Sequence, residues 1–378
     1  MDPVETAAMR RALRLAAHGL GRTNPNPVVG AVVLGADGAV AGSGWHAVAG
    51  GPHAEVVALA AAGGRARGGT AVVTLEPCAH TGRTAACTEA LLHAGVRRVV
   101  YAVADPHPRA AGGAEVLRAG GVEVASGLLA DEAEFANSAW LTAVRRRRPF
   151  LTWKFAASLD GRSAAADGTS RWISGPESRA DVHRLRAESD AVLVGIGTVL
   201  ADDPGLTVRA FDWPRQPTRI VAAGDARTPL AARVLDAAAP TLIAVRADAD
   251  PGRVRALRAA GADLLELPAA ADGHVDLAAL VAALFDRGLY RVLAEGGPTL
   301  AGGLLAAGLI DRVIGYLAPT LLGAGPVALG FAGVSTLAAA VRLRPVSARS
   351  FGVDLRVEAH PVGPGTDLVD LPVRAGEG

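Results

Sequence analysis

Short apolar runs alternate with helical patterns along nearly the whole chain, and this alternation limits the folds open to it. In the first 145 residues the apolar runs, rich in valine, are Val28 to Leu34, Ala71 to Leu75 and Arg98 to Val103. Helical patterns cover His53 to Ala62 and Thr84 to Ala94. Because layered folds are built from strands and helices in turn, the sequence predicts an α/β layer fold.

The alternation is interrupted by the charge run Arg145 to Arg148, which Pro149 follows. Proline disfavours helical geometry in the residue before it, so a helical segment ends there. A chain of 378 residues is also long for one compact domain. We therefore predict one domain over residues 1–145, a second over residues 149–361 and a loose tail over residues 362–378. The four arginines are interpreted as a solvated helix end.

Strand patterns resume after the boundary and are again separated mostly by helical patterns. The last pattern, Ser347 to Glu358, alternates like a late antiparallel strand or hairpin. The earlier strands are expected at Phe150 to Phe155, Ala191 to Gly195, Arg219 to Ala223, Thr241 to Val245, Arg291 to Ala294 and Arg312 to Leu317.

Composition narrows the classes of partner and location. Charged residues make up 20% of the chain and the net charge is +1, which argues against disorder and against a nucleic-acid-binding surface. A small-molecule partner is expected, and a homo-oligomer stays open. Cys78 and Cys87 are the only cysteines, and no charged-then-apolar leader opens the chain, so we expect a cytoplasmic protein.

One uncharged stretch, Val313 to Val341, is long enough to span a bilayer. It contains Pro319, Pro326 and five glycines, which would break a spanning helix more than once. We predict a buried strand, a glycine-rich loop and a helix here, and no membrane association.

The strongest chemical signal joins His53, Cys78 and Cys87 with Glu55. One histidine and two thiolates can hold zinc with a fourth position open for water, whose pKa the metal lowers to about 7. Glu55 would then move protons from the water to the substrate. Each residue alone has a simpler explanation, as a helix start or a small buried hydrophobe. Their combination predicts a catalytic zinc site.

A structural zinc site is the alternative, and it would require four protein ligands where the sequence offers three plus Glu55. His80 lies close to Cys78. As a fourth ligand it would exclude water, so its role is left between substrate contact and loop packing. In nucleobase deaminases two residues usually separate the cysteines, whereas eight separate Cys78 from Cys87 here.

This longer spacing resembles that of the riboflavin-pathway diaminopyrimidine deaminases. The resemblance covers the loop from Ala79 to Ala86, Asn24 to Gly30, Pro52 to Val56, Thr74 to Cys78 and Asp105 to Pro108. It implies a cytidine-deaminase-like three-layer α/β/α domain in which Asn26 contacts the pyrimidine. The family often has two prolines where Ala85 and Ala86 stand.

Motifs of the second half resemble the reductase domain of the same bifunctional enzymes, which has a dihydrofolate-reductase-like fold and uses NADPH. They are Lys154 to Gly161, Ser170 to Ser174, Gly195 to Pro204, Leu206 to Arg209 and Glu295 to Leu300. By this resemblance the cofactor is lined by Ala156, Trp172, Thr198, Asp202, Gly297, Pro298, Thr299, Leu300, Ala301, Gly302 and Gly303. The substrate would be held by Ser170, Arg186, Leu206, Arg209 and Glu295.

Arginine suits a substrate that carries a ribose phosphate, although a surface salt bridge is the alternative for each one. The sequence departs from the family at Ala222 to Gly224, where an Asp-Ser pair is common and the serine contacts the cofactor. Gly224 cannot make that bond, and a backbone amide or Asp225 is a candidate replacement.

The resemblance of both halves implies a bifunctional enzyme. It would deaminate 2,5-diamino-6-ribosylamino-4(3H)-pyrimidinone 5′-phosphate with zinc, and reduce the ribosyl group of the product to ribityl with NADPH. The rival hypothesis is a zinc deaminase of another nucleobase or nucleoside with an inactive accessory domain. A basic groove with stacking aromatic residues would favour a nucleic-acid substrate, but aromatic residues are 4% of the chain.

Overall fold

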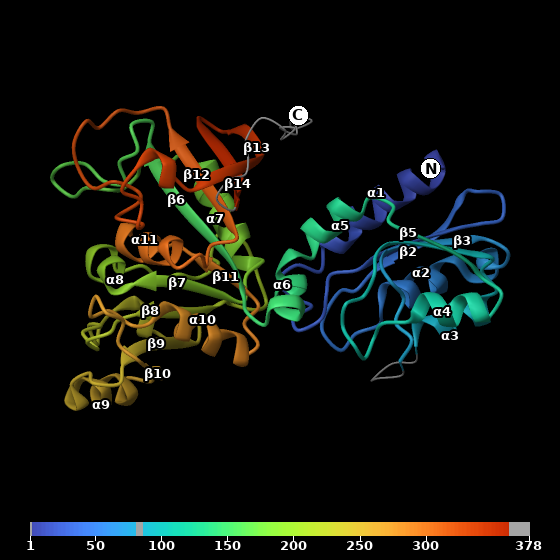
Figure 1. Cartoon of the computed structure of the whole chain (residues 1–378), viewed down its shortest axis with the longest axis horizontal. Coiled ribbons are helices and arrows are strands. Elements are labelled where there is room, and N and C mark those ends of the chain that lie inside the picture. Colours follow the sequence, from blue (N-terminus) through green and yellow to red (C-terminus); the bar gives the residue numbers. More distant parts are fainter. Residues whose placement is uncertain (1, 81–85, 363–378) are drawn as a thin grey trace. The chain divides into compact units, whose positions relative to one another are not determined.

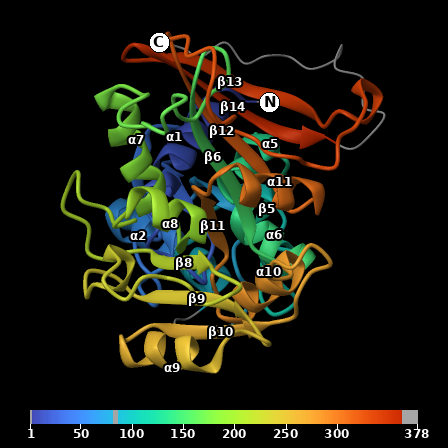
Figure 2. The same ribbon diagram turned by 90° about the vertical axis from the view of Figure 1, so that its left-hand side faces the viewer.

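The computed structural model describes residues 2–80 and 86–362. Two compact units divide the chain between Arg148 and Pro149, and each is considered by itself (Figures 1 and 2). The elements of the first unit are α1 (Pro3–Ala17), β1 (Gly30–Leu34), β2 (Val40–Trp45), α2 (Ala54–Ala62), η1 (Gly63–Ala66), β3 (Thr70–Leu75), α3 (Cys87–Ala94), β4 (Arg98–Val103), α4 (Gly113–Ala119), β5 (Glu123–Ser126), α5 (Ala130–Ala136) and α6 (Ser138–Arg146).

A five-stranded sheet in the order β2-β1-β3-β4-β5 forms the middle layer of the first unit. Strands β3, β4 and β5 are parallel, and β1 is antiparallel to both β2 and β3. Helices α2, α3 and α4 pack on one face of the sheet through Ala58, Leu91 and Leu117. Helices α1 and α5 cover the other face through Met9 and Ala133. The unit has the expected three-layer α/β/α architecture.

The second unit is built on a longer sheet. Its elements are β6 (Phe150–Ser158), α7 (Pro176–Ala187), β7 (Ala191–Gly195), α8 (Ile196–Asp202), β8 (Thr218–Ala222), η2 (Arg233–Leu235), β9 (Thr241–Arg246), α9 (Pro251–Ala259), β10 (Asp263–Leu267), α10 (Leu277–Asp286), β11 (Arg291–Ala294), α11 (Pro298–Ala306), β12 (Arg312–Ala318), η3 (Leu337–Ala339), β13 (Arg342–Phe351) and β14 (Asp354–Val362).

The nine strands lie in the order β10-β9-β8-β7-β11-β6-β12-β14-β13. All pairs from β10 to β12 are parallel, and β12, β14 and β13 form an antiparallel end. Helices α10 and α11 pack on one face through Leu284 and Leu304. The other face is covered by α7, α8 and α9, through residues such as Val199 and Leu257. The carboxyl ends of the parallel strands therefore open at one edge between two helical layers.

The strands expected at Ala191 to Gly195 and at Arg291 to Ala294 are confirmed residue for residue. The late hairpin is confirmed as β13 and β14. The helix expected at the end of Val313 to Val341 is wrong, because after β12 that stretch contains only the three-residue 3₁₀ turn η3. Leu337 is 83% exposed, so the segment has no apolar surface against which a helix could pack. In the described parts of the chain, no helix combines the length and hydropathy needed to cross a membrane.

Candidate functional site

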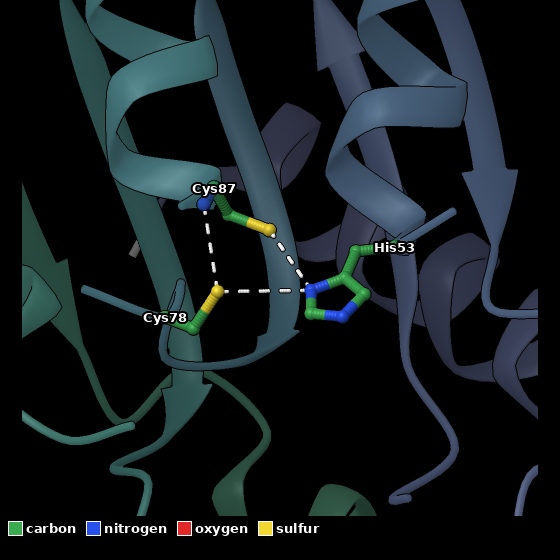
Figure 3. Close-up of side chains that lie close together, drawn as sticks. All are labelled: His53, Cys78 and Cys87. Atoms are coloured by element: carbon green, nitrogen blue, oxygen red, sulfur yellow. Dashed lines mark hydrogen bonds between the residues drawn. The ribbon is translucent and has the colours of Figure 1, made fainter. Parts of the chain in front are cut away.

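Three potential metal ligands converge at the carboxyl end of β3 (Figure 3). His53 is the N-cap residue of α2, Cys87 is the first residue of α3, and Cys78 follows β3. The His53 Nδ1 atom lies 3.2 Å from the Cys87 Sγ atom and 3.6 Å from the Cys78 Sγ atom. All three ligand atoms lie within 4.8 Å of one another. The fold thus joins two helix starts and a strand end, as the sequence indicated.

These distances fit a tetrahedral zinc ion. Zinc–sulfur and zinc–nitrogen bonds of about 2.3 and 2.0 Å would place nitrogen and sulfur ligands about 3.6 Å apart. Hydrogen bonding to Cys87 is the largest cause that lowers the pKa of Cys78, to about 4. The same bond and burial raise the pKa of Cys87. Two sulfur atoms so close cannot both ionise without a cation, and a dication provides that charge.

Glu55 is a buried carboxyl group near the three potential ligands. It is the second residue of α2 and is only 5% exposed. Burial is the main cause that raises the pKa of its carboxyl group. It does not belong to the group of three ligands, so it can carry a proton beside them.

A second histidine links the expected substrate contact to the metal ligand. The Nδ2 atom of Asn26 lies 3.1 Å from Nε2 of His46, and Nδ1 of His46 lies 3.0 Å from the carbonyl oxygen of Pro52. The amide of Asn26 donates to the imidazole, and the imidazole donates to Pro52, the residue before His53. His46 is 3% exposed. This arrangement leaves the amide oxygen of Asn26 as an acceptor for a ligand. His46 was not identified from the sequence as a site residue.

Glu76 anchors the segment that carries Cys78. Its carboxylate is 7% exposed and accepts hydrogen bonds from the backbone nitrogens of Asp105 (3.1 Å) and Ala114 (2.9 Å). Next to Ala114, a Cβ atom on Gly113 would lie 1.7 Å from the carbonyl oxygen of Pro77. The close approach of the chain at Gly113 therefore requires glycine.

His80 was expected to contact the substrate or to pack within the loop after Cys78. His80 is exposed and does not belong to the three-ligand group. Residues 81–85, which include most of the loop that resembles the family, lie outside the described residues.

The second unit contains a cavity of about 1750 Å³ at the carboxyl edge of its parallel strands. The predicted cofactor residues that line it are Ala156, Trp172, Thr198, Asp202, Gly297, Pro298, Thr299, Leu300 and Gly303. All five predicted substrate residues also line it: Ser170, Arg186, Leu206, Arg209 and Glu295. Ala301 and Gly302 do not. Both are buried, and a Cβ atom on Gly302 would lie 2.4 Å from the carbonyl oxygen of Phe331.

The start of α11 borders this cavity and is held by α8. The backbone nitrogen of Gly297, the N-cap residue of α11, donates a 3.1 Å hydrogen bond to Thr198 Oγ1. Near the end of α8, Asp202 accepts a 3.4 Å hydrogen bond from Ser170. The first turn of α11 exposes backbone N–H groups to the cavity, which suits phosphate.

Arg186 and Glu295 are paired, although both were expected to hold substrate. The Nε and Nη2 atoms of Arg186 lie 2.6 and 2.9 Å from the two carboxylate oxygens of Glu295. A third nitrogen of Arg186 donates to the carbonyl oxygen of Thr207 at 3.1 Å. With three of its nitrogens engaged, the Arg186 guanidinium is held mainly by the protein.

Lys154 was quoted in a motif but not identified as a site residue. It is the only lysine of the chain, and its Nζ atom lies 4.0 Å from Glu295 in the cavity wall. Burial is the main cause that lowers the pKa of Lys154. Every other long basic side chain of this protein is an arginine, which stays charged even when buried, whereas the pKa of a buried lysine can fall. The single lysine in the sequence could therefore have indicated that this position needs an amine.

Two family models match this chain in the regions of the two sites. "Cytidine and deoxycytidylate deaminase zinc-binding region" matches residues 3–103, and "RibD C-terminal domain" matches residues 149–357. The riboflavin biosynthesis protein RibD of Mycobacterium tuberculosis H37Rv is 46% identical over 339 residues, covering 89% of this chain and 91% of that protein. RibD of Escherichia coli K12 is 43% identical, with 94% and 98% covered. The chain belongs to the RibD family.

Solved structures of RibD proteins agree with this result. Acinetobacter baumannii RibD has a TM-score of 0.84 at 39% identity, covering 95% of this chain and 99% of that one. The Thermotoga maritima deaminase/reductase also has a TM-score of 0.84, at 32% identity and the same coverage. The expected family, fold class and bifunctional activity are confirmed: a zinc-binding deaminase and an NADPH-using reductase of riboflavin biosynthesis.

Proposed function

We propose that His53, Cys78, Cys87 and Glu55 carry the deamination, and that the cavity of the second unit carries the reduction. The substrate of the first step is 2,5-diamino-6-ribosylamino-4(3H)-pyrimidinone 5′-phosphate, and its product is the substrate of the second. We assign the two steps to residues 1–145 and 149–361. The observation that carries the proposal is the meeting of three zinc ligands beside a buried carboxyl group.

His53, Cys78 and Cys87 would hold zinc, which supplies Lewis acidity that makes water a nucleophile at neutral pH. Glu55 accepts the proton that the attacking water loses and passes it to the ring nitrogen and the departing ammonia. Asn26, whose amide orientation is held by His46, presents its oxygen to the pyrimidine. The carbon–nitrogen bond to the amine breaks, and ammonia leaves.

The reduction adds a hydride to C1′ and breaks the bond between C1′ and the ribose ring oxygen, and this oxygen takes a proton and stays on the chain as a hydroxyl group. NADPH supplies the hydride when it is bound. The backbone N–H groups of Thr299 and Leu300, in the first turn of α11, would hold its pyrophosphate. Lys154, whose Nζ atom lies 4.0 Å from the Glu295 carboxylate in the cavity wall, is our candidate for the proton source.

Arg209 is our candidate for the residue that binds the phosphate of the substrate. It lines the cavity, and burial is the main cause that lowers its pKa, followed by the charges of Arg186 and Arg233. A phosphate would relieve this crowding of positive charge. We further propose a cytoplasmic enzyme that acts on a small molecule and not on nucleic acid.

The test is a coupled assay with zinc-loaded protein and the diaminopyrimidine phosphate. Ammonia release followed by NADPH oxidation is expected. Replacement of Glu55 by glutamine should lower the rate of ammonia release by a factor of about 10² or more. The zinc content, and reduction of the deaminated intermediate supplied directly, should not change.

Glu89→Gln is the matched control, because Glu89 is an exposed carboxylate in the first turn of α3. It should leave ammonia release unchanged. Undiminished ammonia release in Glu55→Gln would refute the proposed role of Glu55, and absence of ammonia release from the unmodified protein would refute the assigned substrate.

A further inference from the structure

We propose that Arg227 and Arg246 bind the 2′-phosphate of NADPH and so select this cofactor over NADH. The inference rests on the NADPH-dependent reduction assigned to the second unit. Both side chains line the same cavity as Thr198 and Glu295. Arg246 ends β9, and Arg227 lies in the segment after β8, so both are at the carboxyl ends of neighbouring parallel strands.

Arg246 has different charged neighbours from the arginines expected to hold the substrate. Arg186 and Arg209 act on each other and on His183, whose pKa is lowered to about 4, mainly by burial. Arg246 instead has Asp248 and Asp225 as its charged neighbours. The bound reactants also bring two separate phosphate monoesters, the 5′-phosphate of the substrate and the 2′-phosphate of the cofactor. Arg209 and Arg246 are therefore candidates for binding different phosphates.

The order of the strands matches the length of the cofactor. The sheet runs β9-β8-β7-β11, and α11, whose first turn suits the pyrophosphate, follows β11. Two strand spacings, about 10 Å, separate β11 from β8. The adenosine ribose is joined directly to the pyrophosphate, so its 2′-phosphate lies one sugar beyond α11. If the nicotinamide end points toward Glu295, the adenosine end is directed toward β8 and β9.

Gly224 explains how Arg246 reaches this position. The backbone nitrogen of Arg246 donates to the Gly224 carbonyl oxygen at 2.9 Å, and a Cβ atom on Gly224 would lie 3.2 Å from Arg246 Cγ. The side chain of Arg246 therefore packs over the bare glycine. A serine, which is common at this place in the family, would press on that side chain. In this chain a guanidinium takes the place of the missing hydroxyl group.

Both guanidinium groups are oriented by protein contacts and keep donors for a ligand. Arg246 donates through Nε to Asp248 and through Nη1 to the carbonyl oxygen of Gly273, each at 2.7 Å. The Nε atom of Arg227 lies 3.2 Å from Asp225. Within residues 2–80 and 86–362, no partner is found for Nη2 of Arg246 or for either terminal nitrogen of Arg227. These nitrogens can form charge-assisted hydrogen bonds with a phosphate.

Asp225 supports a competing interpretation. Its Oδ1 atom is buried without a hydrogen-bond partner and could accept the 2′-hydroxyl group of NADH. Asp225 is already paired with Arg227, and the terminal nitrogens that the two arginines keep for a ligand favour a phosphate over a hydroxyl group. The two interpretations predict opposite effects of removing the arginines.

The experiment compares two nucleotides that differ only in the 2′-phosphate, adenosine 2′,5′-bisphosphate and 5′-AMP. Their Kd values are measured by calorimetry on the full-length protein and on Arg227→Gln, Arg246→Gln and the double variant. In the double variant we expect the Kd of the bisphosphate to rise about tenfold or more, and that of 5′-AMP to stay within about twofold. The kcat/KM for NADPH should fall in parallel, whereas that for NADH should not.

Arg255→Gln is the control, because Arg255 is exposed on α9 and does not line the cavity. Equal weakening of both nucleotides, or an unchanged bisphosphate Kd, would overturn the proposal. Arg227 is 53% exposed in its side chain, so the single Arg227→Gln variant keeps the test valid if the Arg246 variants fold poorly. Oxidation of NADPH by the unmodified protein with the deaminated substrate tests the proposed reduction separately. If that oxidation is observed, a negative result with the arginine variants rejects only this inference.

Discussion

The guanidinium group of Arg186 and the carboxylate of Glu295 form a bidentate ion pair, with Nε–Oε1 and Nη2–Oε2 distances of 2.6 and 2.9 Å. Their side chains are 10% and 8% exposed. Arg186 lies on α7, and Glu295 directly follows β11, so the pair connects a helix to the carboxyl end of a central strand. The charge of Arg186 holds the pKa of Glu295 below its usual range, although burial alone would raise it. Glu295 is therefore ionised and fixed in position.

Removing Arg186 should destabilise the second unit strongly. In Arg186→Met the buried carboxylate of Glu295 loses its bidentate partner and keeps only Lys154, whose Nζ atom lies 4.0 Å away; breaking a buried pair typically costs about 3–5 kcal/mol. The double variant Arg186→Met/Glu295→Gln should recover part of that loss, because it removes the unpaired charge. Denaturant unfolding of the three proteins measures both effects.

Arg258→Met provides the comparison for this pair. Arg258 and Glu266 also form an ion pair, but their side chains are 55% and 49% exposed, so its loss should change stability by about 0.5 kcal/mol or less. Equal effects of Arg186→Met and Arg258→Met would show that burial of the Arg186–Glu295 pair has no energetic consequence.

His46 should contribute to binding of the pyrimidine and not to metal content. In His46→Ala the Asn26 amide loses the acceptor that fixes its orientation. We expect the KM of the deamination to rise about tenfold, as for the loss of one hydrogen bond, with little change in kcat. His46→Gln, which restores an acceptor, should recover part of the effect. Steady-state kinetics with zinc analysis of each variant provide the measurement.

The exposed His93, in the last turn of α3, is the matched position. His93→Ala should behave like the unmodified protein. If His46→Ala lost its zinc, the contact with Pro52 would be the important one, and the role assigned through Asn26 would be refuted.

The central parallel strands were predictable because they are buried on both faces, whereas the partly exposed parallel strands β5 and β10 were not expected. Ala191 to Gly195 is a short, uninterrupted apolar run, and Arg291 is followed by another, Val292 to Ala294; this pattern depends on nearby residues alone. The zinc ligands were predictable for a different reason: few residue types bind zinc, and the chain contains only two cysteines. The reductase contacts came from the resemblance to a family and not from local chemistry.

Other features depend on contacts between distant residues. The pairing of Asn26 with His46 joins residues 20 apart, and that of Arg186 with Glu295 joins residues 109 apart, so neither follows from spacing along the chain. The alanine-rich end of Val313 to Val341 has a high helix propensity. It forms only η3, because a short helix needs an apolar surface to pack against.

Gly113→Ala should disrupt the deaminase site from outside the ligand set. The new Cβ atom would lie 1.7 Å from the Pro77 carbonyl oxygen, and backbone atoms cannot move aside as a flexible side chain can. We expect a loss of about 1–3 kcal/mol in stability, with lower zinc content and ammonia release. Reduction of supplied intermediate should persist. Gly64→Ala is the control, since a Cβ atom on Gly64 would meet no other segment within 4 Å, and equal zinc content in both variants would contradict the prediction.

Glu358 should make the stability of the second unit depend on pH in the acid range. It is 7% exposed on β14, and its oxygens lie 2.9 Å from an Arg356 nitrogen and 3.4 Å from an Arg312 nitrogen. Burial alone would raise the pKa of this carboxyl group, but the two arginines hold it below the usual value. A lowered pKa in the folded state adds stability above the unfolded pKa of about 4.3, and this contribution is lost as the pH falls further.

Replacing Glu358 by glutamine should therefore cost about 3–5 kcal/mol near pH 7, and the difference from the unmodified protein should shrink as the pH falls below about 4. Denaturant unfolding at a series of pH values measures this difference. Glu266→Gln is the control, because its carboxylate is 49% exposed and its pair with Arg258 should contribute little at any pH. A difference that stayed constant from neutral to acid pH would mean that Glu358 contributes through packing, since only an ionised carboxylate loses its attraction to Arg312 and Arg356 on protonation.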